Sequence, residues 1–143
     1  MSISTFRQIH TLTLTFAASR EKVFNFLADI ENLPAWTGGF CEWIELRRDG
    51  WRAYTALGEL AVTTKVDDIA GAIDLELRNP AGWRLVLPVR VSSDGEGGSL
   101  VHAVCRQPVG LADEGYEQLF ESLVDGLRGR AGRMADFAPA GVS

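Results

Sequence analysis

The 143-residue chain contains only two cysteines and two histidines, and it has no long run of apolar residues. Cys41 and Cys105 are too few for a disulfide framework and are not spaced like metal ligands. We therefore expect two free thiols in the interior, with no metal and no cofactor. No stretch reaches the roughly 20 apolar residues of a membrane span, and the first residues lack the apolar segment of a signal peptide. These absences predict a cytoplasmic protein without stable membrane insertion.

Basic residues are outnumbered by acidic ones, and the formal net charge is -5 at pH 7. Affinity for a phosphate backbone depends on clustered Lys and Arg, so this composition argues against a nucleic-acid partner. One local basic cluster comprises Arg128, Arg130 and Arg133. Its spacing is typical of a solvated helix end, where cations complement the helix dipole. A weak contact with an acidic partner is the alternative for this cluster.

The length and composition favour one globular unit. Hydrophobic residues make up 46% of the chain and charged residues 23%, which is ordinary for a protein with a packed core. A chain of this size can bury one substantial core but does not divide comfortably into two. We expect a single domain over residues 1–137, a disordered tail over residues 138–143, and a monomer or homodimer.

Three elements are predicted before residue 40. Alternation of apolar residues with threonines predicts a half-buried strand over residues 9–16. Ser19 has the character of a helix N-cap, and the apolar residues after it recur at helical spacing, namely Val23, Phe26, Leu27 and Ile30. Pro34 interrupts this pattern, so we expect residues 31–36 to form a second, very short helix or a turn.

From residue 40 to about residue 107, short alternating runs are separated by turn signals roughly every ten residues. This pattern predicts an antiparallel meander of six strands. Two of the strands have a clear apolar face opposite a charged one. The residues expected to point inward on these two strands are Ile73, Leu75, Leu77, Trp83, Leu85, Leu87, Val89 and Val91.

The last predicted element is a long amphipathic helix over residues 112–134. Its apolar residues recur at helical spacing and are Tyr116, Leu119, Phe120, Leu123, Leu127 and Met134. Gly126, Gly129 and Gly132 each weaken an isolated helix by about 1 kcal/mol relative to Ala. They are therefore expected where the helix lies close to the sheet, a ligand or a partner. Fraying of the helix end is the alternative.

The element order and one local segment resemble a known superfamily. Residues 18–36 read Ala-Ser-Arg-Glu-Lys-Val-Phe-Asn-Phe-Leu-Ala-Asp-Ile-Glu-Asn-Leu-Pro-Ala-Trp. A small capping residue, a Val-Phe pair, an Asp and Leu-Pro-x-Trp occur in this order in the polyketide cyclase/dehydrase and START-related superfamily, also called SRPBCC. The resemblance implies an α+β helix-grip fold of the Bet v 1 type. That fold has a curved seven-stranded antiparallel sheet, two short helices and a long C-terminal helix.

The resemblance also implies a cavity between the sheet and the last helix, which members of the superfamily use for lipids, polyketides and other apolar ligands. We therefore predict binding of a hydrophobic small molecule of lipid, polyketide or aromatic type. Aromatic side chains supply apolar area together with a polar handle, although packing in the core is the alternative for them. The expected ligand-binding residues are Trp83, Leu85, Leu87, Val89, Leu75, Leu77, Tyr116, Phe120 and Leu123.

The alternative function is a polyketide cyclase or dehydratase-like enzyme that positions its substrate and exchanges protons. The superfamily builds such sites from scattered cavity residues, so no linear motif identifies them. The catalytic candidates are His102, Arg106 and Tyr54, and Trp83 and Tyr116 are further candidates.

Two of these candidates depend on the face that the last strand turns inward, which the sequence leaves open. One face carries Val101, Ala103, Cys105 and Gln107. The other carries Leu100, His102, Val104 and Arg106. His10 and His102 could meet because the first and last strands are neighbours in this fold. We expect structural roles for both histidines, since no carboxylate near them completes a ligand set.

Overall fold

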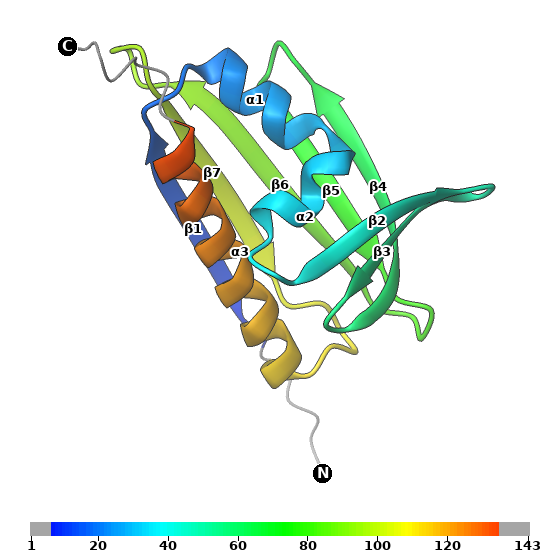
Figure 1. Cartoon of the computed structure of the whole chain (residues 1–143). Helices are drawn as coiled ribbons and strands as arrows, with labels where there is room; N and C mark the ends of the chain where they lie inside the picture. Colours follow the sequence, from blue (N-terminus) through cyan, green and yellow to red (C-terminus); the bar gives the residue numbers. More distant parts are fainter. Residues whose placement is uncertain (1–6, 135–143) are drawn as a thin grey trace.

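The computed structural model describes residues 7–134, so the predicted tail over residues 138–143 lies outside the described part. Seven antiparallel strands form one sheet in the order β1-β7-β6-β5-β4-β3-β2 (Figure 1). The strands are β1 (Ile9–Phe16), β2 (Cys41–Arg47), β3 (Gly50–Thr55), β4 (Gly58–Asp67), β5 (Ala72–Arg78), β6 (Arg84–Ser93) and β7 (Ser99–Arg106). The predicted first strand and six-stranded meander are confirmed.

All helices lie over one face of the sheet (Figure 1). They are α1 (Arg20–Ala28), the 3-10 helix η1 (Ile30–Asn32), α2 (Leu33–Trp36) and α3 (Asp113–Arg133). Ser19 caps α1 by accepting the backbone N–H of Lys22 at 3.2 Å, as its residue type predicts. Asp29 ends α1 and caps η1 by accepting the N–H of Glu31 at 3.0 Å. The first helix therefore ends two residues before Ile30, the last residue of the predicted apolar spacing.

The core lies between the sheet and the helices. The inward residues predicted for β5, β6 and the turn between them are at most 8% exposed, which confirms their orientation. On the opposite face, Asp74 accepts a hydrogen bond from Arg90 at 2.8 Å, and Glu76 pairs with Arg84. The alternation of leucine and charge therefore separates the core from the solvent face across both strands.

The last strand turns its small residues inward. Val101, Ala103 and Cys105 are at most 5% exposed. His102 and Arg106 are exposed on the other face. In the register of β1 with β7, His10 lies opposite Cys105 and Thr13 lies opposite His102. The two histidines therefore point to opposite faces of the sheet and do not meet.

Two glycines hold α3 against the segment between α2 and β2. A Cβ on Gly126 would lie 2.3 Å from the carbonyl oxygen of Trp36 and 2.4 Å from the nitrogen of Gly38. A Cβ on Gly38, whose φ is +64°, would lie 2.0 Å from the carbonyl oxygen of Ser122. Neither position has room for a side chain, so the two backbones are in direct contact. At Gly129 and Gly132 a Cβ would meet nothing within 4 Å.

Arg130, in the last turn of α3, adds to the contact between α3 and the segment that precedes β2. Its Nε donates to the carbonyl oxygen of Ala35 at 3.1 Å, and its guanidinium lies 5.3 Å from the ring centroid of Phe26. The bond satisfies a carbonyl at the end of α2 that has no partner within that short helix. The interpretation of a solvated helix end therefore fits only Arg128 and Arg133, which are exposed.

A pair of alanine substitutions in α3 tests the glycine contact. Gly126→Ala is expected to lower the free energy of unfolding by about 1–3 kcal/mol, because the new methyl group overlaps backbone atoms that have little freedom to move. Gly129→Ala is expected to raise it by up to about 1 kcal/mol, because it gains helix propensity without a clash. Urea unfolding followed by tryptophan fluorescence measures both. Equal effects of the two substitutions would contradict the contact.

Candidate functional site

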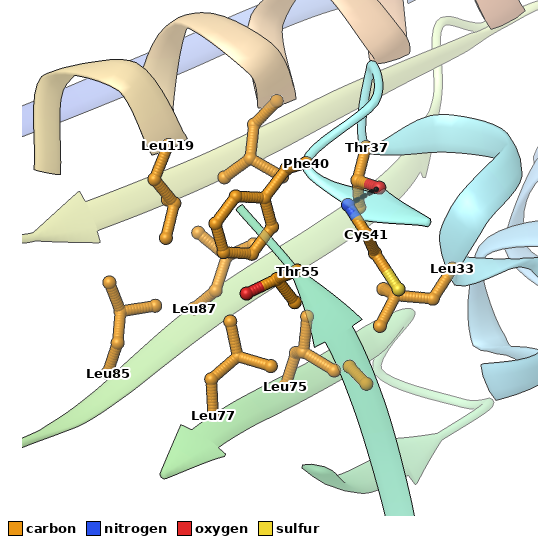
Figure 2. Close-up of a pocket in the computed structure, with 12 residues that line it drawn as sticks. Leu33, Thr37, Phe40, Cys41, Thr55, Leu75, Leu77, Leu85, Leu87 and Leu119 are labelled. Atoms are coloured by element: carbon orange, nitrogen blue, oxygen red, sulfur yellow. Dashed lines mark hydrogen bonds between the residues drawn. The ribbon is translucent and has the colours of Figure 1, made fainter. Parts of the chain in front are cut away.

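A small cavity of about 10 Å³ lies between the sheet and α3 (Figure 2). This volume corresponds to about one water-sized sphere. Its floor and one wall consist of leucines from two adjacent strands and from one face of α3, namely Leu75, Leu77, Leu85, Leu87, Leu119 and Leu123. The helix-grip arrangement is therefore present, but its interior is almost filled by side chains.

Five of the residues expected at the ligand site line this cavity, and they are Leu75, Leu77, Leu85, Leu87 and Leu123. The other four do not line it. Val89, Trp83 and Tyr116 are buried elsewhere in the same core, and Phe120 packs against it. Tyr116 and Phe120 both contact the ring of His10 on β1. Ligand binding by any of these residues remains a prediction.

The remaining wall comes from six residues that the sequence did not place at the ligand site, although it predicted a buried thiol at Cys41. They are Leu33, Thr37, Phe40, Cys41, Ala53 and Thr55. They belong to α2, to the segment between α2 and β2, and to β2 and β3, and the curvature of the sheet brings them over the leucines of β5 and β6. No local pattern marks them, because each approaches the cavity through a contact with a distant segment. Leu119 also lines the cavity without having been expected at the ligand site, but a sequence signal for it exists. It precedes Leu123 by one helical turn on the predicted apolar face of α3.

The ring of Phe40 occupies the middle of the cavity. Figure 2 shows it surrounded by Leu119 of α3, by Leu77 of β5 and by leucines of β6. Phe40 is only 4% exposed. Its backbone is held on both sides, because its N–H donates to Thr37 at 3.1 Å and its carbonyl accepts from Ala56 at 3.0 Å. The buried ring therefore fills space between the sheet and α3 that would otherwise belong to the cavity.

The hydroxyl groups in the cavity wall form hydrogen bonds with backbone groups. The hydroxyl of Thr37 accepts the N–H of Cys41 at 3.2 Å. The hydroxyl of Thr55 donates to the carbonyl of Gly58 at 2.7 Å and accepts the N–H of Leu57 at 3.0 Å. The cavity lining contains no His, Asp, Glu, Lys or Arg. An apolar ligand would therefore meet no charged group inside.

The three catalytic candidates lie on the outer face of the sheet. His102 is exposed, and its Nδ1 lies 2.8 Å from the hydroxyl of Thr13. Arg106 is exposed on the same face of β7. Tyr54 packs against Trp43, with ring centroids 4.7 Å apart, and donates to Glu45 at 2.7 Å. The alternative in which His102 and Arg106 are the polar groups of the cavity is wrong, because strand alternation directs both to the opposite face.

An open groove lies beside the cavity on the surface of the protein. It has a volume of about 350 Å³ and runs between α3, the segment before β2 and the turn between β3 and β4. We call it the α3 groove. Its lining consists of Gly38, Gly39, Phe40, Ala56, Leu57, Gly115, Gln118, Leu119, Glu121, Ser122 and Asp125. Phe40 and Leu119 line both the groove and the cavity. These two side chains therefore form the partition between them.

No family model and no curated protein matches the sequence. Solved structures do match over most of the chain. A START superfamily protein from Mycobacterium smegmatis shares 17% identity at a TM-score of 0.61, and the match covers 88% of this chain and 98% of that one. The chain has the START-like helix-grip fold. This confirms the predicted fold class.

Two further structures have the same START-like fold. An uncharacterised protein from Bacillus thuringiensis shares 19% identity at a TM-score of 0.70, with 90% of this chain and 100% of that one covered. An aromatase/cyclase from a Streptomyces species shares 14% identity at a TM-score of 0.69, with 90% and 95% covered. At these identities the similarity establishes the START-like fold and not an activity.

Tyr116 joins α3 to the edge of the START-like sheet. Its hydroxyl donates to the carbonyl of Cys105 at 2.6 Å and lies 3.1 Å from Nδ1 of His10. Because the single hydroxyl proton is used at Cys105, Nδ1 of His10 must carry the proton that it shares with Tyr116. The His10 ring also stacks on Phe120 with centroids 4.7 Å apart. Burial raises the pKa of Tyr116, so the hydroxyl stays protonated as a structural anchor.

Both thiols of the START-like domain are free and buried. Burial raises the pKa of Cys41 and that of Cys105 to about 11 each, so both are protonated at neutral pH. A thiol must ionise to act as a nucleophile, and neither does. Within residues 7–134, no three His, Cys, Asp or Glu side chains are grouped so that they could hold a metal ion, and no helix is suited to cross a bilayer.

The buried thiols predict a loss of stability in alkali. Each thiol has a pKa near 9.0 when unfolded and about 11 when folded, so only the unfolded chain releases these protons between those values. The contribution of the thiols to the free energy of unfolding is thus fully present below pH 9 and is lost as the pH rises towards 11. The expected loss is about 1 kcal/mol per thiol at pH 10 relative to pH 8. Urea unfolding at both pH values measures this loss.

The double variant Cys41→Ala, Cys105→Ala is the control, and it should lose less stability between the two pH values than the wild type. A chromogenic disulfide reagent provides a second check, because the native thiols should react far more slowly than those of the unfolded chain. Rapid reaction of the folded protein at pH 8 would show that the thiols are accessible and that their pKa values are not raised.

Proposed function

We propose that the protein binds a hydrophobic small molecule of lipid, polyketide or aromatic type between the sheet and α3. The observation that carries this proposal is the leucine-rich cavity without charged residues, separated from an open groove by the side chains of Phe40 and Leu119. Transfer of apolar ligand surface into such a site contributes roughly 25 cal/mol per Å². The START-like fold supports the proposal, because it has the same sheet-and-helix frame as the solved aromatase/cyclase.

Binding requires the site to enlarge. The cavity of about 10 Å³ is far smaller than the roughly 300–1,000 Å³ of common ligand sites, whereas the α3 groove of about 350 Å³ is within that range. Rotation of the Phe40 ring out of the leucines would join the two spaces. The free energy of moving the ring lowers the apparent affinity, since only the open conformation accepts ligand.

The alternative function, a polyketide cyclase or dehydratase-like enzyme, receives less support. Proton exchange needs an acid or base within reach of the substrate. The cavity lining has no ionisable group apart from the protonated thiol of Cys41. His102, Arg106 and Tyr54 face solvent on the other side of the sheet, and the hydroxyl of Tyr116 is engaged by Cys105 and His10. Binding without chemical conversion is therefore the better-supported function.

The proposal also includes a cytoplasmic location, a monomeric or homodimeric state and no nucleic-acid partner. Two free thiols are compatible with a reducing compartment, and a net charge of -5 disfavours a phosphate backbone. Light scattering of the purified protein distinguishes a monomer from a homodimer.

The uncharged fluorescent probe N-phenylnaphthylamine tests the proposed binding. Ala53 is fully buried on β3 and lines the cavity, so Ala53→Leu should fill the site and weaken probe binding at least about fivefold. Ala61 lies on β4 opposite Arg52 and Arg78, on the outer face, so Ala61→Leu should leave binding unchanged. If Ala53→Leu does not fold, Ala53→Val replaces it. Fluorescence titration gives the affinities.

Two results would contradict the proposal. One is the absence of both probe binding and a thermal shift with any member of a panel of lipids, polyketides and aromatic compounds. The other is probe binding that Ala61→Leu weakens as much as Ala53→Leu, which would place the bound probe on the outer face of the sheet.

A further inference from the structure

The cavity and the α3 groove are adjacent spaces with different chemistry. Phe40 and Leu119 belong to both linings, and the ring of Phe40 points into the leucines (Figure 2). The backbone of Phe40 is fixed by its hydrogen bonds to Thr37 and Ala56. Opening therefore needs rotation of the ring about its own side-chain bonds and no rearrangement of the sheet. A molecule that displaces the ring would reach from the groove into the cavity.

The groove differs from the cavity in polarity. Gln118, Glu121, Ser122 and Asp125 line it from α3, whereas the facing segment contributes Leu57 and small residues. Glu121 and Asp125 are exposed and one helical turn apart, and neither forms an ion pair with another residue of the described range 7–134. The groove thus offers hydrogen-bonding groups and two carboxylates without an ion pair in the described range, at the outer end of an apolar interior.

We propose that the cavity and the α3 groove form one two-part site for an amphipathic small molecule with a neutral or cationic polar end. Its apolar part takes the place of the Phe40 ring between the leucines of β5 and β6. Its polar end stays in the groove beside Glu121 and Asp125, where a carboxylate is repelled. This inference rests on the proposed function, and it narrows the ligand class from apolar compounds in general to amphiphiles that are not anionic.

Three ligands with the same alkyl chain test the charge preference. Dodecylamine, dodecanol and dodecanoate compete with N-phenylnaphthylamine at neutral pH, at low salt and below their micelle concentrations. The amine should bind more tightly than the alcohol, and the alcohol more tightly than the acid. The amine and the acid should differ about fivefold or more, as expected for one charged group near two exposed carboxylates. The difference should shrink at high salt because exposed charges are screened.

Variants that replace carboxylates by amides test whether the preference for the amine over the acid arises in the groove. Glu121→Gln with Asp125→Asn should bring the affinities of the amine and the acid within about twofold of each other. Glu31→Gln with Glu96→Gln makes the same change in net charge at residues that do not line the groove. This control should preserve the wild-type order. Loss of the order in the control pair would show a long-range charge effect and overturn the assignment of the polar end to the groove.

Phe40→Ala tests the displacement of the ring. All three ligands should bind about tenfold more tightly, because no ring has to leave the leucines, while their order is unchanged. If Phe40→Ala does not fold, Phe40→Leu replaces it with a smaller expected gain. Unchanged affinity in a folded variant would overturn the role of Phe40 as the partition.

The outcomes also separate this inference from the proposed function. Dodecanoate that binds as tightly as dodecylamine overturns the preference for a neutral or cationic end. Probe binding that none of the three alkyl ligands displaces overturns the two-part site and leaves binding of compact apolar molecules in place. Absence of probe binding in the wild type and in Phe40→Ala removes the proposed function itself.

Discussion

The backbone contact between Gly38 and Gly126 fixes the distance between α3 and the segment that precedes β2. Because neither residue has a side chain, the helix and the segment approach until their peptide groups touch. Arg130 adds a hydrogen bond to Ala35 at the same crossing. Phe40 follows two residues after Gly38, so this crossing determines where its ring stands relative to the leucines of the sheet. The size of the cavity and its separation from the groove both depend on it.

The other end of α3 is held by polar contacts. Gln107 is 6% exposed, and its amide donates to the carbonyl of Leu111 at 2.9 Å and to Asp113 at 2.8 Å, while its oxygen accepts the N–H of Gln8 at 3.0 Å. Tyr116 adds its bond to Cys105 one turn later. With both ends fixed, the middle of the helix spans the cavity without a polar anchor. A ligand would therefore displace side chains and leave the helix in place.

Charged side chains lie on the outer face of the sheet and in the α3 groove, and the cavity lining has none. Carboxylates and guanidinium groups pair across the outer face of the sheet, where water and neighbouring opposite charges stabilise them. The interior contains leucines and two threonines whose hydroxyls serve the backbone. In the proposed site, discrimination among ligands inside the cavity would come from shape and apolar area, and the groove would supply polar recognition.

Periodicity in the sequence determined the elements, their order and the inward face of β5, β6 and α3, because these depend on neighbouring residues of one segment. Periodicity also placed Leu75, Leu77, Leu85, Leu87 and Leu123 on inward faces, and the resemblance to the superfamily implied the cavity that they line. Tertiary structure alone decided which face of β7 is buried, since both faces carry mixed residues, and which glycine of α3 is a contact. It also decided that Phe40 fills the cavity, because a residue's own periodicity does not reveal which distant segment packs against it.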